Sequence, residues 1–225
     1  MGLVDPKSLA VTLGRINLAL LEGENLSRQE RKDAASWIAS RMDAPGSYRG
    51  LPAPTGTDRH TKLRLFTGET VGSHAGTGCK LGFEATWALA VLRPKEAPVV
   101  RAAESCMDRV IERFAQETAR RQGMYCCYSC SCAGWRALGA APAGQAGDLL
   151  KAGLAILRSC RDGKGRWHQF PFWYTLLALN GMDRPDALEE MRYAAPALER
   201  AVRGKAMDAF SRRRRLLAGA VLERV

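Results

Sequence analysis

Long apolar runs are missing from this 225-residue sequence. A helix needs about 20 apolar residues to cross a bilayer, and the stretch LAVTLGRINLALLEGENL is interrupted by Arg15, Glu22 and Glu24. We therefore expect no membrane span and no signal peptide, and we predict a cytoplasmic protein. Cysteines usually stay reduced in that compartment. The seven cysteines are accordingly interpreted as thiols or metal ligands rather than as a disulfide framework.

Histidine is scarce too, with three in the chain: His60, His74 and His168. A Cys/His nucleophile pair therefore has few possible bases, and the candidate catalytic pair is Cys127 with His168 or, alternatively, with His74. The ending Gly-Lys-Ser/Thr of a P-loop is absent, although FTGETVGSHAGTGCKLG is rich in glycine. This segment is interpreted either as an anion cradle before a helix or as a flexible loop.

β-Branched residues are sparse, whereas Ala, Leu, Arg and Glu dominate, and this composition favours helices. Ser27 followed by Glu30 predicts a capping box at the start of one helix. Asp5 as N-cap and Pro6 as the first helical residue predict the start of an earlier helix. Pro196 is predicted to kink or break the amphipathic helix that follows Asp183.

Segments that are apolar all round alternate with amphipathic segments, which predicts a buried layer of helices and an outer layer. The buried segments ATWALAVL, GWRALGA and WYTLLALNG share an aromatic residue followed by Ala and Leu. Their residues Leu89, Leu138 and Leu179 are 49 and 41 positions apart, a period typical of stacked helical hairpins. An irregular helical bundle is also compatible with this pattern.

The pattern predicts one all-α domain over residues 1–225, although the length also permits two small domains. Its parts are an N-terminal hairpin (1–43), a long connection (44–72), helical-hairpin repeats (73–203) and a basic C-terminal helix (204–225). The connection is rich in Gly, Pro and Thr, and an alternating piece at Leu63 and Leu65 allows a short strand. Loops of this length often carry function or cover a site.

Four cysteines lie within seven residues of the segment MYCCYSCSCAGWRALGA: Cys126, Cys127, Cys130 and Cys132. On a helix, positions 126 and 130 share a face, and so do 127 and 130, whereas 132 lies well around the helix. Cys126, Cys127 and Cys130 are therefore the candidate metal ligands, with zinc as the candidate ion. Core packing of small thiols and redox or nucleophilic chemistry are the alternatives, and the sequence leaves them open.

Three features resemble the α/α-toroid superfamily, which contains protein prenyltransferase β-subunits and the squalene and terpene cyclases. They are the turn RDGKGRWHQF, the helix FWYTLLALNG and the segment YCCYSCSCAGW. The resemblance implies an all-α fold of stacked hairpins, and the length suits a partial toroid of about four hairpins. It places Cys127 at the ligand cysteine of the prenyltransferases, Tyr125 at their ligand aspartate and Tyr174 at their ligand histidine. Two of three zinc ligands are thus replaced, and the Asp-rich motifs of the cyclases are absent.

The leading hypothesis is a non-catalytic binding or scaffold protein of this fold, compatible with a homodimer. Its inner groove would hold a hydrophobic small molecule or a peptide, against Tyr125, Cys127, Trp135, Trp173 and Tyr174. One alternative is a prenyl-transfer-type enzyme with altered zinc ligands that uses Cys127 and His168. Another is a metal-stabilised module that contacts nucleic acid through a basic tail.

The basic tail is the main charge asymmetry in a chain of net charge +11. Residues 203–225 contain seven basic and two acidic residues, and four arginines, Arg212, Arg213, Arg214 and Arg215, are consecutive. Such a run can contact nucleic acid or an anionic surface. No aromatic residues interleave with the arginines, so a base-stacking platform is not indicated, and a solvated helix face is the alternative interpretation.

Overall fold

The computed structural model describes residues 2–60, 62–121, 123–204 and 207–225, and its regular structure over these ranges is entirely helical. The all-α prediction is therefore confirmed. The helices are α1 (Leu9–Leu21), α2 (Arg28–Ala39), α3 (Gly56–His60), α4 (His74–Leu92), α5 (Ala97–Arg121), α6 (Tyr128–Gly139), α7 (Gly147–Ser159), α8 (Phe172–Asn180), α9 (Pro185–Arg203) and α10 (Ala209–Leu222). The chain forms two compact units, Met1–Arg113 and Phe114–Val225, divided within α5.

Local signals at the helix ends explain where several elements begin. The predicted capping box is present at α2, where Ser27 Oγ accepts the N–H of Glu30 and the Glu30 carboxylate accepts the N–H of Ser27. The predicted start of α1 is wrong, because Ser8, and not Asp5, is its N-cap. The Asp5 carbonyl instead accepts the Ser8 N–H and closes a turn before the helix.

Of the kink or break predicted at Pro196, the break does not occur, since α9 continues through this residue. Pro196 lies on the exposed side of the helix, whereas its neighbours Ala194, Ala197 and Leu198 are buried. The proline removes one backbone donor, and the packing of the buried face holds the helix on both sides of it.

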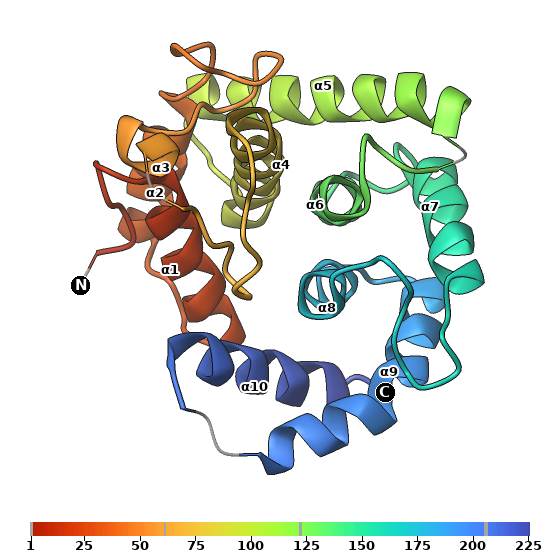
Figure 1. The fold of residues 1–225 in the computed structure, drawn as a ribbon. Helices are drawn as coiled ribbons and strands as arrows, with labels where there is room; N and C mark the ends of the chain where they lie inside the picture. Colours follow the sequence, from red (N-terminus) through yellow and green to blue (C-terminus); the bar gives the residue numbers. More distant parts are fainter. Residues whose placement is uncertain (1, 61, 122, 205–206) are drawn as a thin grey trace. The chain divides into compact units, whose positions relative to one another are not determined.

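The first unit is built around α4, which contacts α1, α2 and α3 (Figure 1). A buried carboxylate fastens the start of α1 to α3, because Asp58 accepts hydrogen bonds from Ser8 Oγ at 2.6 Å, from Leu9 N at 2.9 Å and from Thr55 N at 2.9 Å. The long connection 44–72 thus contributes a short helix to the core. In place of the strand that the sequence allows, it contains an isolated antiparallel bridge between Arg64 and Thr70.

The second unit has two layers of helices. Helices α6 and α8 lie side by side, α7 and α9 cover them, and α10 packs on α8 and α9 (Figure 1). Most residues of α6 and α8 are buried, whereas α7 and α9 bury one face. The alternation of buried and amphipathic helices predicted from the sequence is therefore present in this unit.

A buried carboxylate also joins the layers of the second unit. Glu190 of α9 accepts hydrogen bonds from Arg161 Nη2 at 2.7 Å and from Trp167 Nε1 at 2.9 Å, and it pairs with Arg158 of α7. The turn between Arg161 and Trp167 bends at Gly163 and Gly165, which have positive φ values. This network holds the loop between α7 and α8 in place. Within the described ranges, no helix has both the length and the apolar character that crossing a bilayer requires.

Candidate thiol site at the start of α6

The cysteine-rich segment folds as the N-terminal end of α6. Cys127 is the N-cap, with extended backbone angles (φ −158°, ψ 168°), and its Sγ accepts the backbone N–H of Cys130 at 3.4 Å. The first N–H groups of a helix lack intrahelical partners, and a capping side chain satisfies one of them. Cys126 consequently lies just outside the helix, and Cys130 lies in its first turn.

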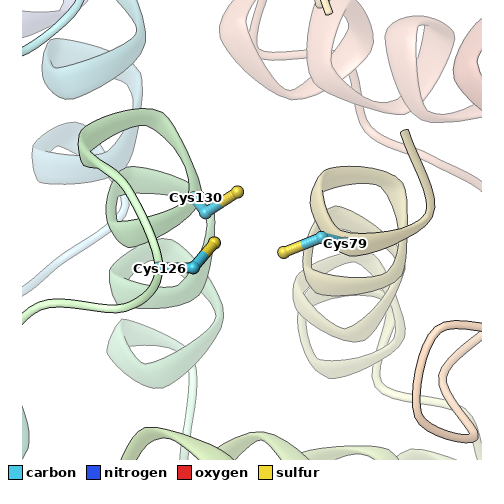
Figure 2. A group of neighbouring side chains, drawn as sticks. All are labelled: Cys79, Cys126 and Cys130. Carbon is cyan, nitrogen blue, oxygen red and sulfur yellow. The ribbon is translucent and has the colours of Figure 1, made fainter. Parts of the chain in front are cut away.

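Two thiols converge at this helix start. The Sγ atoms of Cys126 and Cys130 lie within 4.8 Å of one another, and Figure 2 shows both side chains on the same side of α6. Cys126 is exposed, whereas Cys130 is buried. The third residue drawn in Figure 2, Cys79, belongs to α4 of the first unit. The second unit therefore brings two of its own thiols to close range.

The neighbouring cysteines have other contacts. Cys127 Sγ, besides capping the helix, lies 3.5 Å from Ser129 Oγ. Cys132 is fully buried, and its Sγ lies 3.4 Å from Thr175 Oγ1 of α8. None of the seven cysteines forms a disulfide. Of the three predicted metal ligands, the structure thus brings together Cys126 and Cys130 and gives Cys127 a capping role.

Hydrogen bonds from α6 fasten the segment that carries Cys126. Ser131 Oγ accepts the Tyr125 N–H at 2.9 Å and donates to the Cys127 carbonyl at 2.8 Å. One turn further along, Trp135 Nε1 donates to the Gly123 carbonyl at 3.1 Å. Residues on both sides of Cys126 are therefore anchored to the same helix, which limits the positions that its thiol can take.

The predicted aromatic groove residues are distributed through the second unit. Tyr125 and Trp135 are buried, and they stack on Phe114 and Phe170 with ring centroids 5.3 and 5.5 Å apart, respectively. Tyr174 is 1% exposed within α8. Trp173 is partly exposed, and the Arg214 guanidinium lies 5.9 Å from its ring centroid. These rings belong to the packing between helices, and the exposed Cys127 lies at the helix start.

The catalytic candidates Cys127 and His168 occupy different elements. His168 is exposed on the loop after α7, where its backbone N–H donates to the Cys160 carbonyl at 2.8 Å. In the described part of the chain, no hydrogen bond joins its imidazole to the Cys127 thiol. A thiol and its base need such contact for nucleophilic catalysis, and the contacts of Cys127 are those of a helix cap.

The four consecutive arginines of α10 differ in their surroundings: two lie over aromatic rings and two are exposed. Arg213 lies over the ring of Phe210 at 5.5 Å, and Arg214 lies over Trp173. Burial lowers the pKa of the Arg213 guanidinium. Arg212 and Arg215 are exposed and lie three positions apart, so they share one face of the helix. Lys205, another basic residue of the tail, lies outside the described residues.

Several buried charged residues were not among the candidates predicted from the sequence. Lys80 and Glu84 lie one helical turn apart on α4, and Arg136 lies on α6, all three less than 10% exposed. Their signal in the sequence is a charged residue within a segment that is otherwise apolar. Cys106 of α5 was likewise not singled out, and burial raises the pKa of its thiol to about 12, which makes it a poor nucleophile.

Comparisons with known proteins add no family to this description. No family model, no curated protein and no solved structure matches the chain.

Proposed function

We propose that this protein is a helical binding protein and that its ligand is a thiophilic metal ion, held by the thiolates of Cys126 and Cys130. The observation that carries the proposal is the approach of these two Sγ atoms to within 4.8 Å at the start of α6. The proposed role is binding and not catalysis, as in the leading hypothesis from the sequence. We also propose that the helices stack as hairpins in the manner of an α/α toroid.

The separation of the sulfur atoms suits a shared ion. A zinc–sulfur bond is about 2.3 Å long. Two such bonds hold their sulfur atoms about 3.8 Å apart at the tetrahedral angle and about 4.6 Å apart when they are collinear. The separation in the structure, within 4.8 Å, therefore requires only small rotations of the two side chains. Soft d¹⁰ ions such as Zn²⁺ and Cu(I) are the ions that thiolates prefer.

The surroundings allow an ion to enter and its ligand set to grow. Cys126 is exposed, so an ion can reach it from solvent. Zinc takes four ligands, so a site with two cysteines leaves positions for water, for further side chains or for a bound partner. We therefore expect the bound ion to exchange with solvent.

The experiment is a titration of the reduced, untagged protein with Zn²⁺ in competition with a chromophoric chelator. We expect one ion per chain. Cys126→Ser and Cys130→Ser should each weaken binding by at least about tenfold, since even the loss of an outer hydrogen-bond partner typically costs 10- to 100-fold. Cys160→Ser is the matched control, because this thiol is partly exposed in the same unit at the end of α7, and it should bind as the unchanged chain does.

The proposal is wrong if the chain binds no zinc or if all three variants bind equally well. The same titration with each remaining cysteine changed singly to serine identifies the other ligands. Circular dichroism of every variant separates the loss of a ligand from the loss of the fold.

A second candidate function, contact with an anionic partner such as nucleic acid, is favoured by one observation. Arg212 and Arg215 are both exposed on one face of α10. The second unit also contains 18 basic and 10 acidic residues, and such an excess attracts anions. Its test is the salt dependence of binding, given in the Discussion.

A further inference from the structure

We infer that Cys126 and Cys130 form a reversible disulfide under oxidation by a hydroperoxide and that this bond releases the metal ion. The inference rests on the proposed function, and it adds regulation of the same site. A thiolate that has become part of a disulfide no longer coordinates a metal, so the two states exclude each other.

The exposure of the two thiols sets the order of the reaction. Cys126 is exposed and Cys130 is buried, so a dissolved oxidant meets Cys126 first. Cys126 reacts with hydrogen peroxide to give a sulfenic acid and one water molecule. The Cys130 thiol then attacks the sulfenic sulfur, the S–S bond forms and a second water molecule leaves. Two thiols are oxidised and one peroxide is reduced, so atoms and electrons balance.

The positions of the two sulfur atoms favour a bond between these cysteines. Their sulfur atoms start within 4.8 Å of one another. Cys126 precedes the first residue of α6, so its backbone has no helical hydrogen bond to lose when its side chain turns toward Cys130. A bond length of about 2.05 Å then requires an approach of less than 3 Å, shared by the two side chains.

The adjacent thiol of Cys127 is a poorer partner, although it too is exposed. Consecutive Cα atoms are 3.8 Å apart across a trans peptide, whereas disulfides join Cα atoms that are usually 4.4–6.8 Å apart. Cys127 Sγ also accepts the Cys130 N–H, and a bond to Cys126 would remove that cap. The geometry therefore selects Cys130 as the resolving cysteine.

The test uses the full chain, reduced and stripped of metal, and treated with hydrogen peroxide. Intact mass spectrometry should show the loss of two hydrogens, and peptide mapping should place the bond between Cys126 and Cys130. Dithiothreitol should restore the mass. Cys130→Ser should leave Cys126 as a sulfenic acid that dimedone traps, whereas Cys160→Ser should form the same bond as the unchanged chain.

A second arm separates the inference from the proposed function. Zinc added before peroxide should slow formation of the bond, and peroxide added to the zinc-loaded chain should release the ion to a chromophoric chelator. If zinc binds but peroxide leaves both thiols reduced, the inference is overturned and the proposed function stands. If the bond forms but the reduced chain binds no zinc, the proposed function fails, and with it the claim of metal release. A bond mapped to another pair of cysteines also overturns the inference.

Discussion

Replacement of Glu190 by glutamine should destabilise the second unit more than any change to the exposed carboxylates around it. Glu190 is 1% exposed, and its two oxygens accept hydrogen bonds from Arg161 and Trp167. Glutamine has the same shape but no charge, and its amide group would point N–H donors at an arginine that is itself a donor. The Glu190 carboxylate also helps to raise the pKa of the Arg161 guanidinium, so the two charges favour each other.

The size of the expected loss of stability follows from the burial of Glu190 and the partial exposure of its arginine partners. Removal of one partner from a buried ion pair costs about 3–5 kcal/mol, because the remaining charge is left buried. Here the side chains of Arg158 and Arg161 are 48% and 26% exposed, so water can hydrate them in the variant. We therefore expect a loss of about 2–3 kcal/mol, which lowers Tm by roughly 5–10 °C for a chain of this size.

The assay is urea and thermal unfolding followed by circular dichroism. The matched control is Glu189→Gln, since Glu189 is the adjacent residue and pairs with the same arginines but is 49% exposed. An exposed ion pair contributes about 0–1 kcal/mol, so the control should stay within that range. Equal effects of the two substitutions, or a loss below 0.5 kcal/mol for Glu190→Gln, would refute the account of the network.

Three further predictions concern the N-cap of α6, the stability of the fold at low pH and the basic helix α10. Cys127→Ser should preserve the unfolding free energy in urea, since a hydroxyl is a good N-cap, whereas Cys127→Ala should lower it by about 1 kcal/mol. Arg184 holds the pKa of the Asp186 carboxyl below its usual range, so this pair stabilises the fold above the unfolded pKa of about 3.9 and the contribution disappears as pH falls through the lower folded pKa. Asp186→Asn should therefore flatten the loss of Tm below about pH 4, and an unchanged acid limb would contradict this. If the chain binds duplex DNA, removal of Arg212 and Arg215 should reduce the slope of log K against log salt by about 2; removal of the two arginines between them should change it less, and the reverse order would contradict the assignment.

The sequence was sufficient for the helical class and for the alternation of helices in the second unit, because both depend on local periodicity. It also predicted the Ser27 capping box, since every atom of that motif lies within four residues. The start of α1 was not predictable in the same way. Ser8, the N-cap, also donates a hydrogen bond to Asp58, which is 50 residues away in the sequence. No local sequence pattern reveals that contact.

The candidate site was predictable only in part, for the same reason. The helical spacing placed positions 126 and 130 on one side, as the structure does, although Cys126 lies just before the helix. It could not show that the helix begins at Tyr128, which gives Cys127 a capping role instead of a position on the helix face. The burial of Cys130 and the exposure of Cys126 depend on packing between elements. The order in which the two thiols meet an oxidant therefore cannot be predicted from local sequence.

The most direct test of the central claim is X-ray absorption spectroscopy of the zinc-loaded chain at the zinc K edge. The account predicts at least two sulfur neighbours at about 2.3 Å, of which one is lost in Cys126→Ser and one in Cys130→Ser. A first shell made only of nitrogen and oxygen at about 2.0–2.1 Å, or a sulfur count that neither substitution changes, would contradict it.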